Sequence, residues 1–220
     1  MAVRKIPKNH LFVTGGYSSR KSEEMDAFES LLEKDYLLLL DFDDTVESFE
    51  AQPVRIPVPG VPRGYVPDVL VKYRPHPEMR EIRKPLLAEV KRSEYLEKYA
   101  AKYAPKFAAA TAYAQEMGWE FRPVDETEIR LPRLQNIKFL REYRNVSPSE
   151  KDCNRVVQVI ALHGSSTSSE RVLAELAPTD GERLHWLPVI WSMIQRREVQ
   201  VDLDTPFGPD VPLWVPVEQQ

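Results

Sequence analysis

An aspartate and a glutamate–lysine pair are spaced so that they could meet on neighbouring strands. In residues 86–91, alternation places Glu89 and Lys91 on one face of a strand and apolar side chains on the other. Asp68 opens the preceding apolar run, so we expect it to lie opposite Glu89. Hard carboxylate oxygens hold Mg²⁺, which can bridge a phosphate and lower the pKa of a bound water molecule. The spacing therefore predicts a metal site for phosphodiester hydrolysis, with Lys91 orienting the water or offsetting charge on phosphorus.

This constellation is that of PD-(D/E)xK nucleases, in which an acidic residue from a preceding helix joins a strand-borne aspartate and a Glu-x-Lys triplet. Two carboxylates crowded on a sheet would repel each other without a cation, so a metal also explains why both are tolerated. The alternative interpretation is an exposed strand end with a solvated charged face, because charged side chains usually lie at the surface.

A helix followed by a sheet must position these residues. Ser22 can cap a helix whose first turn carries Glu23 and Glu24, and apolar residues recur at helical spacing up to Leu39. Pro105 should kink or divide a later, tyrosine-rich helix. The expected strands span residues 45–49, 54–58, 69–73, 86–90 and 119–124, and the further helices span residues 94–117 and 131–144.

The last third of the chain has a different pattern of expected helices and strands. Three helical stretches are followed by a hairpin-like tail, which together predict a winged-helix domain. We place the domain boundary near Asn145, with domains at residues 1–145 and 146–220. The helical stretches are residues 151–162, 168–177 and 182–197, and the tail pairs residues 199–203 with 213–217.

The net charge of -4 conceals segments of opposite sign. Lys and Arg outnumber Asp and Glu by 16 to 11 in residues 72–144, and the order reverses to 6 against 11 in residues 145–220. The basic middle segment allows contact with phosphates. Because phosphate attraction scales with basic side chains, the acidic, Trp-bearing last segment suits a protein partner better than a duplex, although winged helices often bind DNA.

Several classes of protein are disfavoured by the remaining features. Cys153 is the one cysteine, which excludes an internal disulfide and a cysteine-based zinc cluster. The longest apolar run, Tyr36 to Leu40, is far shorter than the roughly 20 residues that span a bilayer. The four histidines lack metal-ligand spacing. We expect a bacterial cytoplasmic protein that associates with the nucleoid while it acts.

Several short motifs occur in a fixed order between residues 12 and 144. Together they resemble the TnsA family, the restriction-like endonuclease subunits of heteromeric, Tn-seven-type transposases. The resemblance implies an α/β fold with a restriction-endonuclease-like mixed sheet flanked by helices, followed by the winged helix. The motifs are residues 28–36, 40–43, 52–53, 65–68, 89–91, 126–128 and 134–140.

The resemblance also implies roles for individual residues. Asp68 and Glu89 match the family's two strand-borne metal ligands, and Lys91 matches its lysine. Glu33 matches the acidic residue of the first helix and would complete the metal site, with Glu29, one turn earlier, as the competing candidate. Some members have glutamine at the position of Glu89. Gln52 follows the family's Gln-Pro pattern, and the sequence assigns it no role beyond a polar contact near the site.

The resembling proteins are Mg²⁺-dependent endonucleases, for which Mn²⁺ is the expected substitute. They cleave the 5′ strand at each end of double-stranded transposon DNA during cut-and-paste transposition. A DDE-type transposase subunit, TnsB, cuts and joins the 3′ strand, and an AAA+ ATPase, TnsC, binds the C-terminal region. We expect corresponding partners for this chain.

Basic residues at two places are expected to contact DNA phosphates. Arg20 and Lys21 follow a Gly- and Ser-rich turn before the first helix, and Lys98, Lys102 and Lys106 are stacked four apart on a later helix. The alternative interpretations are a flexible turn and a solvated helix face.

Two other functions remain compatible with the sequence. A stand-alone restriction or repair nuclease of the same fold would cut without partners and would need a stronger DNA-binding face. A non-catalytic adaptor would only join the transposase to the AAA+ regulator, and the presence of all four expected site residues argues against it.

Overall fold

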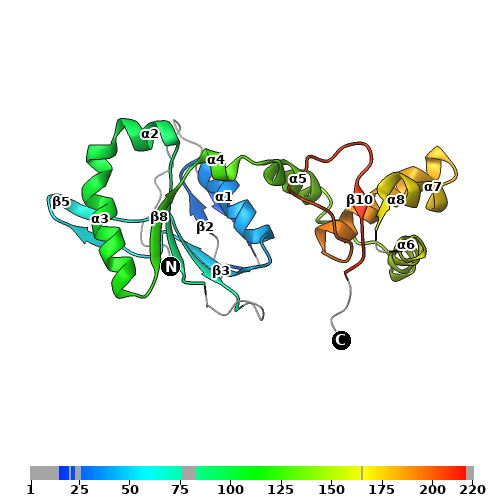
Figure 1. Cartoon of the computed structure of the whole chain (residues 1–220), viewed down its shortest axis with the longest axis horizontal. Helices are drawn as coiled ribbons and strands as arrows, with labels where there is room; N and C mark the ends of the chain where they lie inside the picture. The colour runs from blue at the N-terminus through cyan, green and yellow to red at the C-terminus, as the bar shows by residue number, and fades with distance from the viewer. Residues whose placement is uncertain (1–14, 20, 23–25, 76–82, 165, 217–220) are drawn as a thin grey trace. The chain divides into compact units, whose positions relative to one another are not determined.

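The computed structural model describes residues 15–19, 21–22, 26–75, 83–164 and 166–216. These residues form two compact units (Figure 1); the first ends at Arg130 and the second begins at Leu131. The boundary expected near Asn145 therefore lies inside the second unit. The reason is that α5 (Pro132–Arg141) is tied to the later chain, since Asn136 Nδ2 donates to the carbonyl oxygens of Leu203 and Thr205 at 2.8 Å each. None of the described helices is long and apolar enough to cross a bilayer.

The centre of the first unit is a four-stranded mixed sheet with strand order β3-β6-β7-β8. The β3/β6 and β6/β7 pairs are antiparallel and the β7/β8 pair is parallel. Every residue of β7 is buried, so both faces of the sheet are covered. This mixed α/β architecture fits an endonuclease-like fold. The strands are β3 (Val46–Ala51), β6 (Val69–Tyr73), β7 (Leu86–Val90) and β8 (Glu120–Val124), close to the expected ranges.

Helices cover the sheet through the side chains that alternate along its strands. Leu70 of β6 and Leu87 of β7 lie in one apolar core with Ala110 of α3 (Ala100–Glu116). The helix α1 (Leu31–Phe42) contacts β3 and β7. Asp68 and Glu89 continue the alternation of Leu70 and Leu87, so the sheet presents both carboxylates on the same face.

The helix expected to begin at Ser22 begins later. Residues Asp26–Phe28 form β2, which pairs with β1 (Gly15–Tyr17), and Ser30 caps α1. Ser30 Oγ accepts from the Glu33 backbone N–H at 3.1 Å and donates to Glu33 Oε1 at 3.0 Å. This reciprocal Ser-x-x-Glu contact caps the helix at Ser30. The expected first-turn residues Glu23 and Glu24 lie outside the described residues.

The helix expected to divide at Pro105 divides at Tyr99 instead. It forms α2 (Ser93–Lys98) and α3, with Pro105 inside α3. Tyr99 has φ -114° and ψ 24°, outside the helical region, and its carbonyl accepts from the N–H groups of Lys102 and Tyr103. Pro105 removes one backbone donor, and the helix continues through it.

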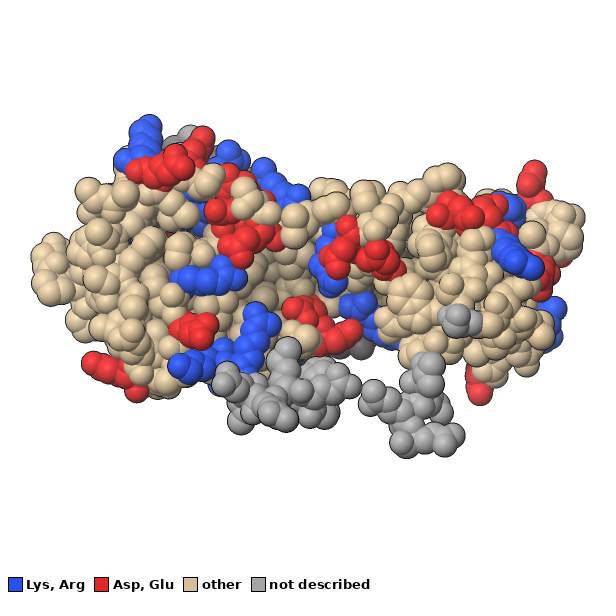
Figure 2. Space-filling view, in the orientation of Figure 1, with Lys and Arg blue, Asp and Glu red and all other residues tan. Residues whose placement is uncertain are grey.

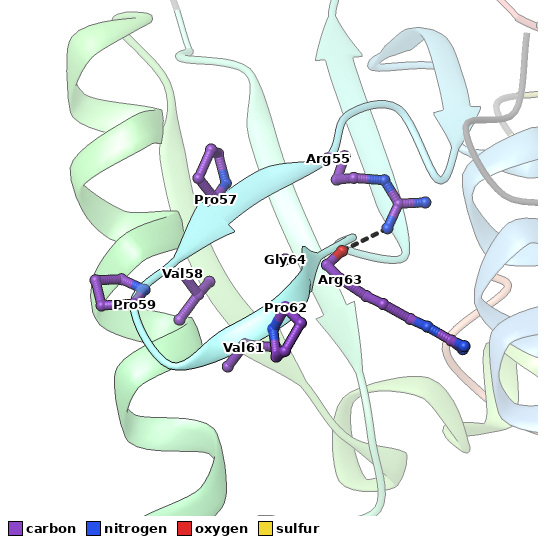
Figure 3. Close-up of a pocket in the computed structure, with 8 residues that line it drawn as sticks. All are labelled: Arg55, Pro57, Val58, Pro59, Val61, Pro62, Arg63 and Gly64. Atoms are coloured by element: carbon purple, nitrogen blue, oxygen red, sulfur yellow. Dashed lines mark hydrogen bonds between the residues drawn. The ribbon is translucent and has the colours of Figure 1, made fainter.

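A hairpin packs against α3, and only the first of its two strands was expected from the sequence. It consists of β4 (Ile56–Val58), which was expected, and β5 (Val61–Tyr65), which was not. Arg55 Nη1 donates to the Arg63 carbonyl at 2.6 Å across the base of the hairpin (Figure 3). Gly64 has φ +63°, and a Cβ there would lie 2.6 Å from the Ile56 carbonyl oxygen, so glycine is required. A pocket on this hairpin contains none of the expected site residues.

The second unit interleaves short strands with helices. The strand β9 lies between α6 and α7 and pairs with β10 in antiparallel fashion. Gln200 and Trp214 form an antiparallel bridge at the place where the tail was expected to pair, and Val217 lies outside the described residues. The elements are α6 (Glu150–Leu162), β9 (Thr167–Ser168), α7 (Ser169–Leu176), α8 (Asp180–Gln195) and β10 (Pro212–Leu213), and α4 (Glu126–Ile129) precedes them in the first unit.

Candidate active site

Asp68, Glu89 and Lys91 converge where β6 begins and β7 ends. Lys91 Nζ lies 3.0 Å from Asp68 Oδ2 and 3.2 Å from Glu89 Oε1. The exposed fraction of the side chain rises from 5% for Glu89 to 15% for Asp68 and 25% for Lys91. The cluster is therefore buried at Glu89 and opens to solvent at Lys91, where a phosphate could approach.

Backbone pairing fixes these side chains. Leu70 pairs with Leu87 and Val69 with Ala88, and this register, continued by one residue, sets Asp68 against Glu89. Asp68 Oδ2 also accepts from the Val90 backbone N–H at 2.8 Å. The carboxylate orientation is therefore set by the sheet itself.

Glu33 faces this cluster from the first turn of α1. Its Oε2 accepts from the Glu29 backbone N–H at 2.7 Å, and the side chain is buried. Burial, followed by the negative charge of Asp68, raises the pKa of Glu33 to about 7. Glu29 takes a different position, since its Oε1 accepts from Gln52 Nε2 at 3.2 Å. Glu33 thus interacts electrostatically with Asp68 and Lys91.

Glu89 has a partner whose role the sequence did not reveal. Tyr65 OH donates to Glu89 Oε2 at 2.8 Å. Burial and the charge of Asp68 raise the pKa of Glu89 to about 8. Burial lowers the pKa of Lys91, but the carboxylates of Asp68 and Glu89 outweigh it, so the pKa of Lys91 is raised overall. The ammonium of Lys91 is therefore the internal counter-charge of the cluster.

Three carboxylates share this single ammonium, which leaves an excess of negative charge when all are ionised. No group of three or more His, Cys, Asp or Glu side chains in the described part of the chain is arranged as a ready metal cluster, and Lys91 contacts both Asp68 and Glu89. Carboxylate oxygens are the donors that a hard divalent cation prefers. The chemistry of these donors therefore suits such a cation, whereas their present arrangement, with Lys91 against both Asp68 and Glu89, is not that of a metal-holding group.

Two family models match the chain. One, described as TnsA-like endonuclease N terminal, matches residues 43–126, and the other, described as TnsA endonuclease C terminal, matches residues 128–203. Together they cover more than half of the 220 residues. The chain belongs to the TnsA endonuclease family. No curated protein matches it in sequence.

Membership of the TnsA family indicates the endonuclease subunit of a Tn-seven-type transposase. The N-terminal match includes Asp68, Glu89 and Lys91 but begins after Glu33. Glu33 is therefore included in the candidate site because of its position on α1 and not because of the family match.

Three of the basic residues expected to contact DNA lie on the helices α2 and α3. Lys106 Nζ is 5.9 Å from the centroid of the Tyr65 ring, which places it beside the residue that binds Glu89. Lys98 and Lys102 lie 5.4 and 5.9 Å from the Tyr99 ring. The lysine stripe thus runs along α2 and α3 and reaches the site at Lys106.

Lys21 contacts the end of α1 and not the candidate site. Lys21 Nζ donates to the carbonyl oxygens of Leu40 and Asp43 at the C-terminal end of α1, the end opposite Glu33. This contact accounts for Lys21 without DNA. Arg20 lies outside the described residues.

Tyr65→Phe is expected to reduce cleavage about tenfold, the lower range for a residue that would orient a metal ligand, if Glu89 holds a metal as expected. Phenylalanine keeps the ring contacts with Phe107 and Phe121, at centroid distances of 6.4 and 6.5 Å, so the fold should persist. Initial cleavage rates would measure the loss, with Tyr113→Phe in the same core as the control. Wild-type rates for Tyr65→Phe would show that its hydroxyl does not orient Glu89.

Proposed function

We propose that this protein is the Mg²⁺-dependent endonuclease subunit that cleaves the 5′ strand at transposon ends. The observation that supports this function best is the meeting of Asp68, Glu89 and Lys91 on adjacent strands, with Glu33 facing them from α1. A buried acidic cluster that opens to solvent at a lysine suits a phosphodiester substrate, which brings its own negative charge and needs cations around it.

Asp68 and Glu89, with Glu33 beside them, would hold Mg²⁺, and Mn²⁺ would substitute for it. The bound cation would supply charge stabilisation at the phosphate and a more acidic water molecule. Tyr65 holds one oxygen of Glu89, and the Val90 backbone N–H holds one oxygen of Asp68, so both ligands are oriented before substrate binds. Lys91 Nζ donates to Asp68 Oδ2 and to the Val90 carbonyl oxygen at 3.0 Å each and lies 3.2 Å from Glu89 Oε1. Because an ammonium has three donors, donation to the attacking water or to a phosphate oxygen would replace one of these contacts.

Strand-resolved cleavage of a labelled transposon-end duplex in Mg²⁺ tests this function. The assay compares the protein alone with the protein plus its TnsB-like transposase. Cutting of the 5′ strand that requires the transposase is expected. Cutting without a partner would instead favour a stand-alone restriction or repair nuclease, and transposition without any 5′-strand cut would favour an adaptor.

Recognition of the transposon end is assigned to the partner. On the face of the molecule in Figure 2, basic and acidic side chains are interspersed and form no continuous basic surface among the described residues. Sequence readout of DNA needs base contacts from a well-anchored basic element. A TnsB-like DDE transposase that reads the end and delivers it to this nuclease supplies that function.

The second unit is proposed to be a winged-helix module that binds a TnsC-like AAA+ ATPase. Its order α6-β9-α7-α8-β10, with β9 paired to β10 and Gln200 bridged to Trp214, supports the winged-helix assignment. Acidic residues outnumber basic ones by 11 to 6 over residues 145–220, which favours a basic protein surface over DNA.

Trp186→Ala is expected to weaken binding of the TnsC-like ATPase by at least about tenfold, the effect of losing an aromatic anchor. Trp186 lies on α8 and lines a surface pocket with Asp152 and Arg155 of α6. The dissociation constant of the full-length protein would be measured by interferometry. Leu162→Ala, which alters a residue that is 74% exposed on α6, is the control. Equal affinities for the Trp186 and Leu162 variants would contradict the assignment.

Replacing Lys102 and Lys106 together by alanine is expected to weaken duplex binding and to lower the slope of log affinity against log salt by about 2, one for each lost phosphate contact. The control is the double change of Lys72 and Lys84 to alanine, since these lysines lie near the opposite ends of β6 and β7 from Asp68 and Glu89. Equal salt slopes for the two double variants would contradict phosphate contact along α3.

A further inference from the structure

Gln52 combines two unusual features next to the candidate site. Its backbone has φ 50°, in the left-handed region that residues other than glycine rarely adopt, and it is 5% exposed. Its Oε1 is buried without a hydrogen-bond partner. Among the described residues, Arg197 is the other non-glycine residue with positive φ, and it follows the end of α8, where such a conformation is common.

The contacts of Gln52 connect two of the three segments that supply acidic residues to the candidate site. Its backbone N–H donates to the Asp68 carbonyl at 2.8 Å, next to the start of β6. Its Nε2 donates to Glu29 Oε1 at 3.2 Å, and the Glu29 backbone N–H donates to Glu33 Oε2 at 2.7 Å. The residue thus spans from the strand of Asp68 to the helix start of Glu33.

Both features cost stability. A left-handed glutamine is strained, and a buried acceptor without a donor has lost its hydrogen bonds to water. Folded proteins keep few such groups, and those present are concentrated at functional sites. The amide orientation follows from its contact with Glu29, which uses Nε2 and leaves Oε1 as the free acceptor.

We propose that Gln52 is a positioning residue that holds the Glu29–Glu33 segment against Asp68, and that its free Oε1 accepts a hydrogen bond from a water molecule of the site. The second half of this inference rests on the proposed nuclease function. The first half concerns the protein's own hydrogen bonds and can be tested without cleavage.

The test compares Gln52→Met with Asn136→Leu in the full-length protein. Methionine keeps the volume and flexibility of glutamine and removes the amide. Asn136 is a buried amide with a purely structural setting, since Nδ2 donates to Leu203 and Thr205 and Oδ1 accepts from the Phe207 N–H. The measurements are thermal unfolding in EDTA, hydrogen–deuterium exchange of the backbone, and calorimetric binding of Mn²⁺ well below the unfolding temperature.

Gln52→Met is expected to keep the wild-type unfolding temperature, to raise exchange at residues 30–34 at least about tenfold, and to weaken Mn²⁺ binding about tenfold or more. Asn136→Leu is expected to lower the unfolding temperature and to leave both other measurements unchanged. Wild-type exchange at residues 30–34 in Gln52→Met would overturn the positioning role. Wild-type Mn²⁺ affinity despite raised exchange would overturn the water contact.

The same measurements separate this inference from the proposed function. If the wild-type protein did not bind Mn²⁺, this result would contradict both the proposed nuclease function and the water contact. Raised exchange in Gln52→Met would still establish that the amide positions the helix start.

Discussion

Asp68→Asn is expected to reduce 5′-strand cleavage by at least about a thousandfold, equivalent to about 4 kcal/mol of transition-state stabilisation. Asparagine has the same shape and retains an oxygen that can accept from the Val90 N–H, so the sheet should be undisturbed. What it removes is the charge of the residue that contacts Lys91 and stands opposite Glu89. The calorimetric affinity for Mn²⁺ is expected to fall with the rate, because one hard ligand is lost.

Stability distinguishes this loss from misfolding. With Asp68 neutral, the negative charge that helps to raise the pKa of Glu33 and of Glu89 is removed, so repulsion within the buried cluster decreases. The thermal midpoint of Asp68→Asn in EDTA should therefore equal or exceed that of the wild type. The control is Asp44→Asn, in the exposed turn after α1. Cleavage by Asp68→Asn within tenfold of the wild-type rate would refute Asp68 as the central ligand.

The part of the site that was predictable from sequence is the part fixed by local alternation. β6 and β7 have the expected bounds, and the register that places Asp68 opposite Glu89 follows from two apolar runs that must bury the same faces. The helix start was wrong because Ser22 and Ser30 both offer a cap, and what selects Ser30 is its reciprocal contact with Glu33 together with the strand pairing of β1 and β2.

The roles of Tyr65 and Gln52 could not be predicted in this way. Tyr65 lies at the end of β5, a strand whose proline and glycine conceal its pattern, and its hydroxyl reaches Glu89 across 24 positions of sequence. Gln52 acts through a left-handed backbone and through Glu29, 23 positions away. Such contacts are set by tertiary packing. The Gln-Pro pair and the tyrosine before Pro-Asp were visible as motifs, but their spacing in the sequence does not show where the two side chains point.

Lys91→Met is expected to change the cleavage rate and the affinity for Mn²⁺ in opposite directions, whereas Asp68→Asn lowers both. Cleavage should fall by about a hundredfold or more, because a cation that can donate to the water or the phosphate is lost. Mn²⁺ should bind more tightly than to the wild type. Lys91 Nζ contacts both Asp68 and Glu89, so its ammonium already neutralises the carboxylates that would bind the metal. Removing it leaves the buried carboxylates without a counter-charge, and the metal becomes their remaining source of one.

The tighter binding of Mn²⁺ by Lys91→Met can also be measured by thermal unfolding. In EDTA, Lys91→Met should unfold at a lower temperature than the wild type, because uncompensated buried charge is destabilising. Added Mn²⁺ should then raise its midpoint by more than it raises that of the wild type, since ligand stabilisation grows with affinity. Lys72→Met, on the same strand as Asp68 but near its far end, is the matched control and should respond as the wild type does. A smaller Mn²⁺ shift in Lys91→Met would mean that Lys91 supports metal binding, which would reverse the role assigned to its ammonium.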